Sequence, residues 1–271
     1  MKTAIVMEAS RGIGRSIAER LAEDGFAVVV QFSGLAQEAM ETVAGIIESG
    51  GLAIAMEADA AQDEEVKRLF ENSLRELGRI DVVVAGAGTL ALAPIARGDM
   101  ESFDETIRTD LRATFLVCSQ AAIHLGEGGR IIAFSSHAAG SAPPSCGAHV
   151  ASKAGIEGLV RVLAKEVHEH RVTVNAIAFG ASATQHLLLA KQGEPAVSSG
   201  EIPLSDVIRE TRDILHLVSF LAGPDAGWVS GQVIPVTEGL GNGENFLRTG
   251  AGSFPAPGEA ASWDLIAAHP H

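Results

Sequence analysis

The amino-acid sequence predicts an α/β fold, a doubly wound parallel sheet in a single domain with a C-terminal tail. Three observations lead to this prediction. Short apolar runs bounded by turns alternate along the chain with longer amphipathic stretches. The first apolar run leads into a glycine-containing turn and then into a helical pattern. Hydrophobic residues make up 46% of the 271 residues, so the chain can bury a sizeable core.

The apolar runs are predicted to be strands, and the amphipathic stretches between them are predicted to be helices. Because strand and helix alternate, the strands are expected to run parallel with helices on both faces, as in a Rossmann-type fold. The predicted strands lie at residues 3–7, 27–32, 52–57, 80–85, 130–135, 171–177 and 232–236. The predicted helices lie at residues 12–24, 35–49, 62–77, 99–125, 149–169 and 206–222.

The domain organisation follows from the same pattern. Residues 1–240 contain no linker that would divide them, and are expected to form one Rossmann-type domain. Residues 180–205 have Gly, Ser and Pro punctuation with weak periodicity, which predicts a mobile loop. Residues 241–271 follow the last predicted strand and are rich in Gly, Ala and Pro, so we expect a C-terminal extension.

Composition excludes several classes of partner. The formal net charge is −14, and an acidic surface attracts neither nucleic acid nor an anionic membrane. No apolar run approaches about 18 residues and no charged-then-apolar leader precedes the first strand, so we expect a soluble, cytoplasmic protein. The two cysteines match no metal-ligand spacing, and no metal site is predicted.

The first predicted strand ends in a turn that is typical of nucleotide-binding sites. The run from Ser10 to Gly14 places Gly12 and Gly14 between the strand and the first predicted helix. Glycines at such a turn let backbone N–H groups approach a pyrophosphate, and the amino end of the helix favours its negative charge. The turn therefore predicts a dinucleotide site at the start of this helix.

Further segments extend this pattern. Asp59 follows the third predicted strand, Ala87 and Gly88 follow the fourth, Ser136 follows the fifth, and Lys153 lies in a later helix. On these segments and the glycine turn, the chain resembles the short-chain dehydrogenase/reductase family from residue 1 to about 240. The resemblance implies NADP(H) as cofactor. It implies cofactor contacts at Ser10, Arg11, Gly12, Ile13, Gly14, Asp59, Ala87, Gly88, Lys153 and Thr184.

The resemblance favours NADPH over NADH. Arg11 stands where NADP-preferring members contact the 2′-phosphate, and residues 30–34 lack the acidic residue that would hold a ribose 2′-hydroxyl. Glu8 departs from the pattern of the family, because it brings a carboxylate into the phosphate-binding turn. Two like charges about 4 Å apart repel by roughly 4 kcal/mol at an effective dielectric of about 20. Either Glu8 weakens or abolishes cofactor binding, or its side chain points into solvent.

The resemblance also implies a catalytic set of asparagine, serine, tyrosine and lysine, of which this chain keeps two. Serine is Ser136 and lysine is Lys153, whereas the asparagine position holds Asp110. The tyrosine position, four residues before the lysine, holds His149, and the chain contains no tyrosine at all. The candidate catalytic residues are therefore Asp110, Ser136, His149 and Lys153.

This altered set has two interpretations. His149 and Lys153 are one helical turn apart and share a helix face. An imidazole can accept, relay or donate a proton near neutral pH, and Asp110 can balance Lys153 or orient His149. The four residues then form an acid/base cluster whose charges differ from those of the asparagine, serine, tyrosine and lysine set. In the alternative interpretation, the active site has decayed and His149 only fills space.

The leading functional prediction is an NADP(H)-dependent reductase of a small carbonyl or imine/iminium substrate, with an altered proton-transfer site. Ketone reduction needs a proton donor at the carbonyl oxygen, whereas reduction of an iminium ion does not. One alternative is a non-redox catalyst, such as a cyclase, dehydratase or isomerase, that needs only shape and one positioned base. Another is a catalytically silent binding subunit. The family includes enzymes of alkaloid and polyketide pathways, which makes secondary metabolism one expectation.

The expected partners are a small-molecule substrate and further copies of the chain. By the resemblance, a homodimer or homotetramer is expected to form through the helices predicted at 99–125 and 149–169 and near Trp228. No nucleic acid and no membrane is expected as a partner.

Overall fold

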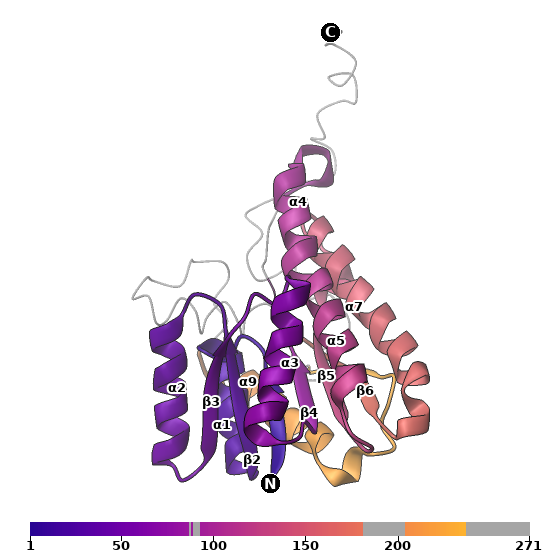
Figure 1. The fold of residues 1–271 in the computed structure, drawn as a ribbon. Coiled ribbons are helices and arrows are strands. Elements are labelled where there is room, and N and C mark those ends of the chain that lie inside the picture. The colour runs from indigo at the N-terminus through magenta and orange to yellow at the C-terminus, as the bar shows by residue number, and fades with distance from the viewer. Residues whose placement is uncertain (87, 89–92, 181–203, 237–271) are drawn as a thin grey trace, which may run out of the picture.

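The computed structural model describes residues 1–86, 88, 93–180 and 204–236. Within these residues, seven parallel strands form one sheet in the order β3-β2-β1-β4-β5-β6-β7 (Figure 1). The predicted Rossmann-type α/β fold is therefore confirmed. The strands are β1 Lys2–Val6, β2 Phe26–Phe32, β3 Leu52–Glu57, β4 Val82–Ala85, β5 Arg130–Ser136, β6 Thr173–Phe179 and β7 Val233–Pro235.

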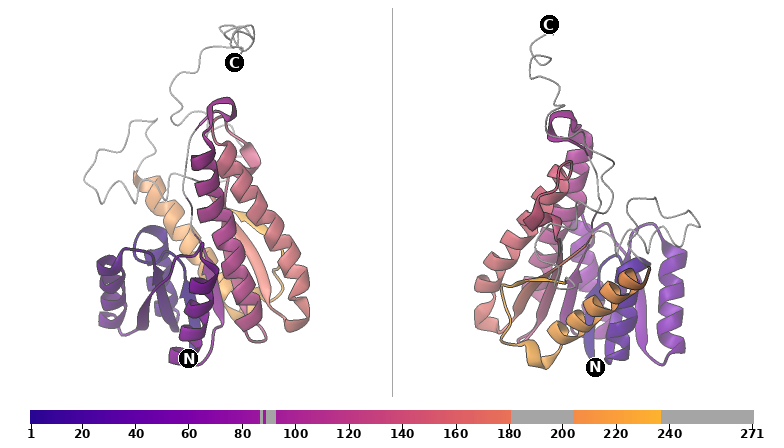
Figure 2. Two further views of the ribbon diagram at one scale, coloured as in Figure 1. Left: turned by 45° about the horizontal axis from the view of Figure 1, so that its top comes forward. Right: turned by 180° about the vertical axis from the view of Figure 1, so that it is seen from behind.

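Helices cover both faces of this sheet (Figures 1 and 2). One face is covered by α1 Gly12–Glu23, α2 Ala36–Glu48 and α9 Leu204–Ala222, and the other by α3 Asp63–Leu77, α5 Ala113–His124 and α7 Gly147–Glu166. A further helix, α4 Met100–Thr106, joins α5 through a π-helical turn, η2 Ile107–Arg112. The short helices are η1 Ile95–Arg97, α6 Ala138–Ser141, η3 His168–His170 and η4 Pro224–Ala226.

Alternation along the strands fills two apolar cores. In β2, Val28 and Val30 pack under α1, α2 and α9, while Val29 packs on the opposite face under α3 and α5. All three side chains are fully buried, so the strand is apolar on both sides. The strand order reverses between β1 and β4, and ligands of such sheets bind in the crevice outside the carboxyl ends at this point.

Some element boundaries differ from the sequence-based expectation. The helix predicted at 99–125 is interrupted by the π turn η2, and strands β4 and β6 begin two residues later than predicted. Ile80 and Val172 precede these strands and are buried. Their apolar character marks burial rather than strand pairing, which explains the early predicted starts.

Most of the predicted loop at 180–205 and the predicted extension at 241–271 lie outside the described residues. In the part of the chain that the structure describes, no helix combines the length and apolar character needed to cross a bilayer. The ranges 1–86, 93–180 and 204–236, with Gly88, also contain no group of three or more side chains arranged to hold a metal ion.

Candidate active site

The glycine turn lies at the carboxyl end of β1. Gly12 has a φ of +58°, in the left-handed region that favours glycine. A Cβ added at Gly14 would lie 2.3 Å from the carbonyl oxygen of Glu8, so only glycine allows α1 to pack this closely on the turn. The first backbone N–H groups of α1 have no partner within the helix and are available to an anion. The turn therefore has the shape of a phosphate site.

The other residues predicted in this turn have different environments. Arg11 is exposed, whereas Ser10 and Ile13 are buried. The Ser10 carbonyl accepts a hydrogen bond from Thr42 Oγ1 at 3.2 Å, and Ile13 packs into the core under α1. Ser10 and Ile13 therefore anchor the turn with their side chains turned inward, and Arg11 is the member whose side chain is accessible to a ligand.

Glu8 adopts a backbone conformation that is uncommon for a residue with a Cβ. Its φ is +53°, and such conformations cost about 1–2 kcal/mol in residues other than glycine. The buried Gln31 holds this conformation in place. Its Oε1 accepts from Glu8 N–H at 2.7 Å, and its Nε2 donates to the Ala58 carbonyl at 2.5 Å. Gln31 thus ties the glycine turn to the end of β3.

The charge of Glu8 is also unusual. Glu8 is partly accessible to solvent, yet desolvation by the surrounding protein raises the pKa of its carboxyl group above the ordinary value. Arg11 lowers this pKa and Asp59 raises it, and both effects are smaller than that of desolvation. Glu8 is therefore a weaker acid than an ordinary glutamate, in the turn where phosphates are expected.

Asp59 lies directly beyond β3 and is already engaged. Its Oδ1 accepts from Ala61 N–H at 2.9 Å, and its Oδ2 pairs with Arg108 Nη1 at 3.2 Å.

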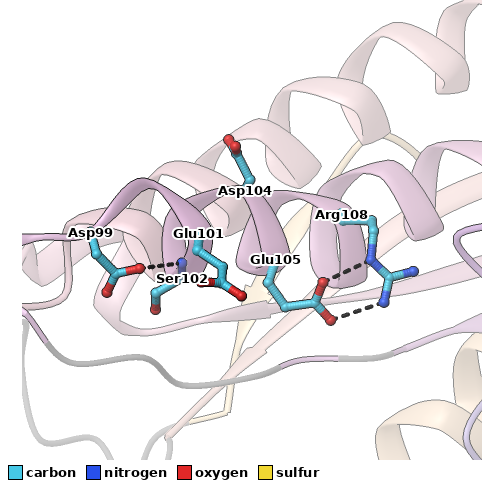
Figure 3. Close-up of a pocket in the computed structure, with 6 residues that line it drawn as sticks. All are labelled: Asp99, Glu101, Ser102, Asp104, Glu105 and Arg108. Carbon is cyan, nitrogen blue, oxygen red and sulfur yellow. Dashed lines mark hydrogen bonds and ion pairs between the residues drawn. The ribbon is translucent and has the colours of Figure 1, made fainter.

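Arg108 also pairs with Glu105 at 2.8 Å, at the edge of an open hollow of about 790 Å³ on α4 (Figure 3). The hollow is lined by Asp99, Glu101, Ser102, Asp104, Glu105 and Arg108. Asp99 caps α4 by accepting from Ser102 N–H at 2.7 Å, so this hollow is a solvated helix start.

The predicted catalytic residues come together around Asp110, which lies in the π turn η2 and is fully buried. Its Oδ2 lies 3.6 Å from Lys153 Nζ and 3.8 Å from His149 Nδ1. Ser152 Oγ lies 3.1 Å from the same oxygen and 2.9 Å from the His149 carbonyl, so its single hydroxyl hydrogen is shared between these two acceptors. One carboxylate therefore faces two basic side chains, both supplied by α7.

Lys153 is buried beside this carboxylate. Burial lowers the pKa of its ammonium group, and Asp110 acts in the opposite direction through its charge and a hydrogen bond. Nζ lies 3.5 Å from the Phe134 carbonyl on β5. A Cβ added at Gly88 would lie 3.0 Å from Nζ, so glycine beyond β4 leaves room for the lysine. Lys153 thus lies between Gly88, beyond the end of β4, and the Asp110 carboxylate.

Ser136 is the last residue of β5, at the same edge of the sheet. Its side chain is buried, and its Oγ accepts a hydrogen bond from Ala138 N–H at 3.2 Å. The hydroxyl hydrogen is not used in that bond, so it can be donated to a substrate oxygen.

Comparisons with known proteins match this architecture over most of the chain. A family model described as enoyl-(acyl carrier protein) reductase matches residues 8–241. A mutant of a short-chain dehydrogenase/reductase from Serratia marcescens has a similar structure, with a TM-score of 0.76, 27% identity, and coverage of 86% of this chain and 95% of that chain.

The chain belongs to the short-chain dehydrogenase/reductase family.

Two further proteins are similar to it. The hydroxynaphthalene reductase-like protein Arp2 of Metarhizium robertsii is 38% identical over 254 residues, covering 88% of this chain and 94% of that protein. The angucycline C-6 ketoreductase LanV, solved with bound NADP, has a TM-score of 0.75 and 29% identity, with coverage of 87% of this chain and 93% of that chain.

Sequence reasoning about this short-chain dehydrogenase/reductase missed Gln31 and Ser152 as site residues. Gln31 carried a signal, because it is a polar residue inside the apolar run of β2. Ser152 carried a weaker one, as a hydroxyl between His149 and Lys153 on α7. Of the predicted cofactor residues, Ala87 and Thr184 lie outside the described residues.

Proposed function

We propose that this chain is an NADP(H)-dependent reductase of a small carbonyl or imine substrate in which His149 is the proton donor. The observation that carries the proposal is the buried Asp110 carboxylate, 3.8 Å from His149 Nδ1 and 3.6 Å from Lys153 Nζ. A buried anion facing an imidazole fixes its orientation and stabilises the imidazolium. The names of the hydroxynaphthalene reductase-like relative and the angucycline ketoreductase support a ketone on a fused aromatic ring system as the substrate.

The glycine turn fits a dinucleotide. Gly12 supplies the positive φ of the turn, Gly14 lets α1 pack closely on it, and Arg11 is the exposed cation suited to a 2′-phosphate. Gly88 and Lys153 are the residues that would hold the nicotinamide ribose. When bound, NADPH supplies the hydride.

The side chains of the cluster account for the proton. Ser136 Oγ donates a hydrogen bond to the substrate oxygen and fixes its position. The imidazolium of His149 gives its proton to that oxygen as negative charge develops there. Asp110 holds the imidazolium through Nδ1, and Lys153 keeps the carboxylate from being an unpaired buried charge. An iminium substrate would need only the positioning, since its reduction neutralises an existing charge.

A second candidate, a non-redox cyclase, dehydratase or isomerase, is favoured by one observation. Glu8 brings a carboxylate into the phosphate turn, and its negative charge would repel a bound pyrophosphate. In this candidate the acid/base cluster acts without hydride transfer. Measuring NADPH and NADH binding by calorimetry separates the candidates, because only the reductase requires NADPH to bind.

We expect the substitution pair His149→Phe and His149→Tyr to test the proton donor. NADPH oxidation is measured with a panel of fused-ring aromatic ketones, and the variant His168→Phe, at an exposed histidine in η3, is the control. His149→Phe should lower turnover by about 10²–10⁴-fold, as expected for loss of a general acid, whereas His149→Tyr should retain it. Equal rates in the wild type and both variants would remove His149 from the mechanism.

For assembly, we propose a homodimer or homotetramer that uses α5 and α7. These helices expose large apolar side chains: Phe115 is 54% exposed, Ile123 66% and Val162 55%. Such side chains on adjoining helices are suited to a buried interface between subunits. Light scattering at micromolar concentration tests the assembly, and Phe115→Asp should produce monomers if this surface is used.

A further inference from the structure

His137 follows Ser136 directly, between the carboxyl ends of β5 and β6. Its backbone N–H donates to the Phe179 carbonyl at 3.2 Å. Its carbonyl accepts from Gly140 N–H at 3.1 Å and from Ser141 N–H at 3.0 Å, which starts the short helix α6. The backbone of His137 is therefore fixed on both sides, next to the serine hydroxyl of the candidate active site.

The imidazole of His137 has a buried nitrogen that lacks a partner. Nε2 is buried and has no hydrogen-bond partner among the described residues. Burial lowers the pKa of the ring, and the Ala178 backbone partly offsets this effect. A ring nitrogen accepts a hydrogen bond when it has no hydrogen and donates one when it has a hydrogen. A hydroxyl group can do either, so it can pair with Nε2 in both cases.

A buried polar atom without a partner is rare in folded proteins, and one beside an active-site residue is consistent with a ligand contact. Leaving such a group unpaired corresponds to about 5- to 150-fold in an equilibrium constant. A hydroxyl group of a ligand would complete it. His137 follows Ser136 with adjacent Cα atoms only about 3.8 Å apart, so one substrate is large enough to reach both residues.

We propose that His137 Nε2 forms a hydrogen bond with a hydroxyl group of the substrate, so that the enzyme selects carbonyl compounds with a hydroxyl on the same ring or the adjoining ring. The proposal rests on the proposed function, because it takes the substrate oxygen to lie at Ser136. It makes His137 a specificity-determining residue, separate from the acid/base cluster of Asp110, His149 and Lys153. The ring binds the substrate hydroxyl and takes no proton in the reaction.

The test compares the binding of fused bicyclic aromatic ketones that carry one hydroxyl, as a set of positional isomers, with the binding of the parent ketone. Dissociation constants are measured by calorimetry in the presence of NADP⁺, which allows no turnover. The wild type should bind at least one hydroxylated isomer about 5- to 150-fold more tightly than the parent. His137→Phe should abolish this preference, and His137→Gln, whose amide oxygen is an acceptor, should keep part of it.

Equal binding of the parent and every isomer by the wild type would overturn the proposal, as would an undiminished preference in His137→Phe. Circular dichroism checks the fold of each variant, and His137→Ala replaces His137→Phe if the phenylalanine is not accommodated. Failure of the proposed function has a different signature. In that case no ketone supports NADPH oxidation, while the binding preference and its loss in His137→Phe are still measured.

Discussion

Two carboxylates distinguish the two ends of the candidate site. Glu8 lies in the glycine turn with an exposed side chain, and Arg11 only partly offsets the effects that make it a weak acid. Asp110 lies in the catalytic cluster, fully buried, with Lys153 and His149 both within 4 Å. The same chemical group thus lies where phosphates are expected at one end and beside two basic side chains at the other. The comparison teaches that the effect of a carboxylate is set by the charges that face it.

The largest expected effect comes from Asp110→Asn, which removes the anion and leaves Lys153 buried without its partner. Breaking a buried pair in this way costs about 3–5 kcal/mol of unfolding free energy. Denaturant unfolding near neutral pH measures it. Asp104→Asn on α4, an exposed acidic residue, is the control and should change stability by less than about 0.5 kcal/mol.

The pH dependence of Asp110→Asn gives a second check. Burial already lowers the pKa of Lys153, and without Asp110 this pKa should fall further below its unfolded value. Between the folded and the unfolded pKa of Lys153, the unfolded state binds more protons than the folded state, so stability rises with pH. The deficit of the variant should therefore shrink as pH increases toward the unfolded pKa of lysine. A deficit that is constant with pH would show that Lys153 is not the source of the loss.

A smaller effect is expected from Glu8→Gly, which removes both the carboxylate and the cost of a positive φ. We expect NADPH to bind about tenfold more tightly, a change of about 1.4 kcal/mol. Calorimetry at constant ionic strength measures the dissociation constant. An unchanged value would show that the Glu8 carboxylate does not face the phosphates.

Glu8→Gln isolates the charge. The pKa of Glu8 is raised in the free protein, and a neighbouring phosphate would raise it further, so the complex would bind more protons than the free protein. NADPH affinity should then be highest at acidic pH and fall as pH rises through these two values. The 2′-phosphate of NADPH is present in both measurements. The difference between wild type and Glu8→Gln in how NADPH affinity changes with pH therefore reports Glu8 alone.

The smallest effect is expected from Ser152→Ala, which removes one of the donors to Asp110. The loss of one such hydrogen bond costs about 1 kcal/mol of unfolding free energy. Thermal or denaturant unfolding measures this, with Ser141→Ala in α6 as a control because its hydroxyl bonds only to the His137 carbonyl among the contacts described. A loss as large as that of Asp110→Asn would mean that Ser152, rather than Lys153 and His149, provides most of the compensation.

Much of the fold was predictable because its signals are local. The apolar runs of β1 and β2 and the glycines at 12 and 14 act within a few residues of where they stand. The π turn η2 was not predicted, because one extra residue within a helix leaves no clear pattern in the sequence.

The site was predictable in its members but not in its contacts. Asp110, His149 and Lys153 were expected together, and the structure places them around one carboxylate oxygen. The roles of Gln31 and His137 needed coordinates. The Gln31 amide bridges two turns from different strands, and the unpartnered Nε2 of His137 is visible only once its surroundings are in place.

The π turn at Ile107–Arg112 makes the number of residues between α4 and α5 important. A π turn holds one residue more than the α-helical hydrogen-bond pattern allows, so the helical phase changes at Asp110 between α4 and α5. Downstream, Ala113, Val117 and Ala121 are buried in the core. Deleting one residue from the turn would rotate the two halves by about 100° relative to each other, and either the carboxylate or this apolar face would turn away. Deleting or inserting a residue in this segment is therefore expected to disturb the site and the core more than substituting one.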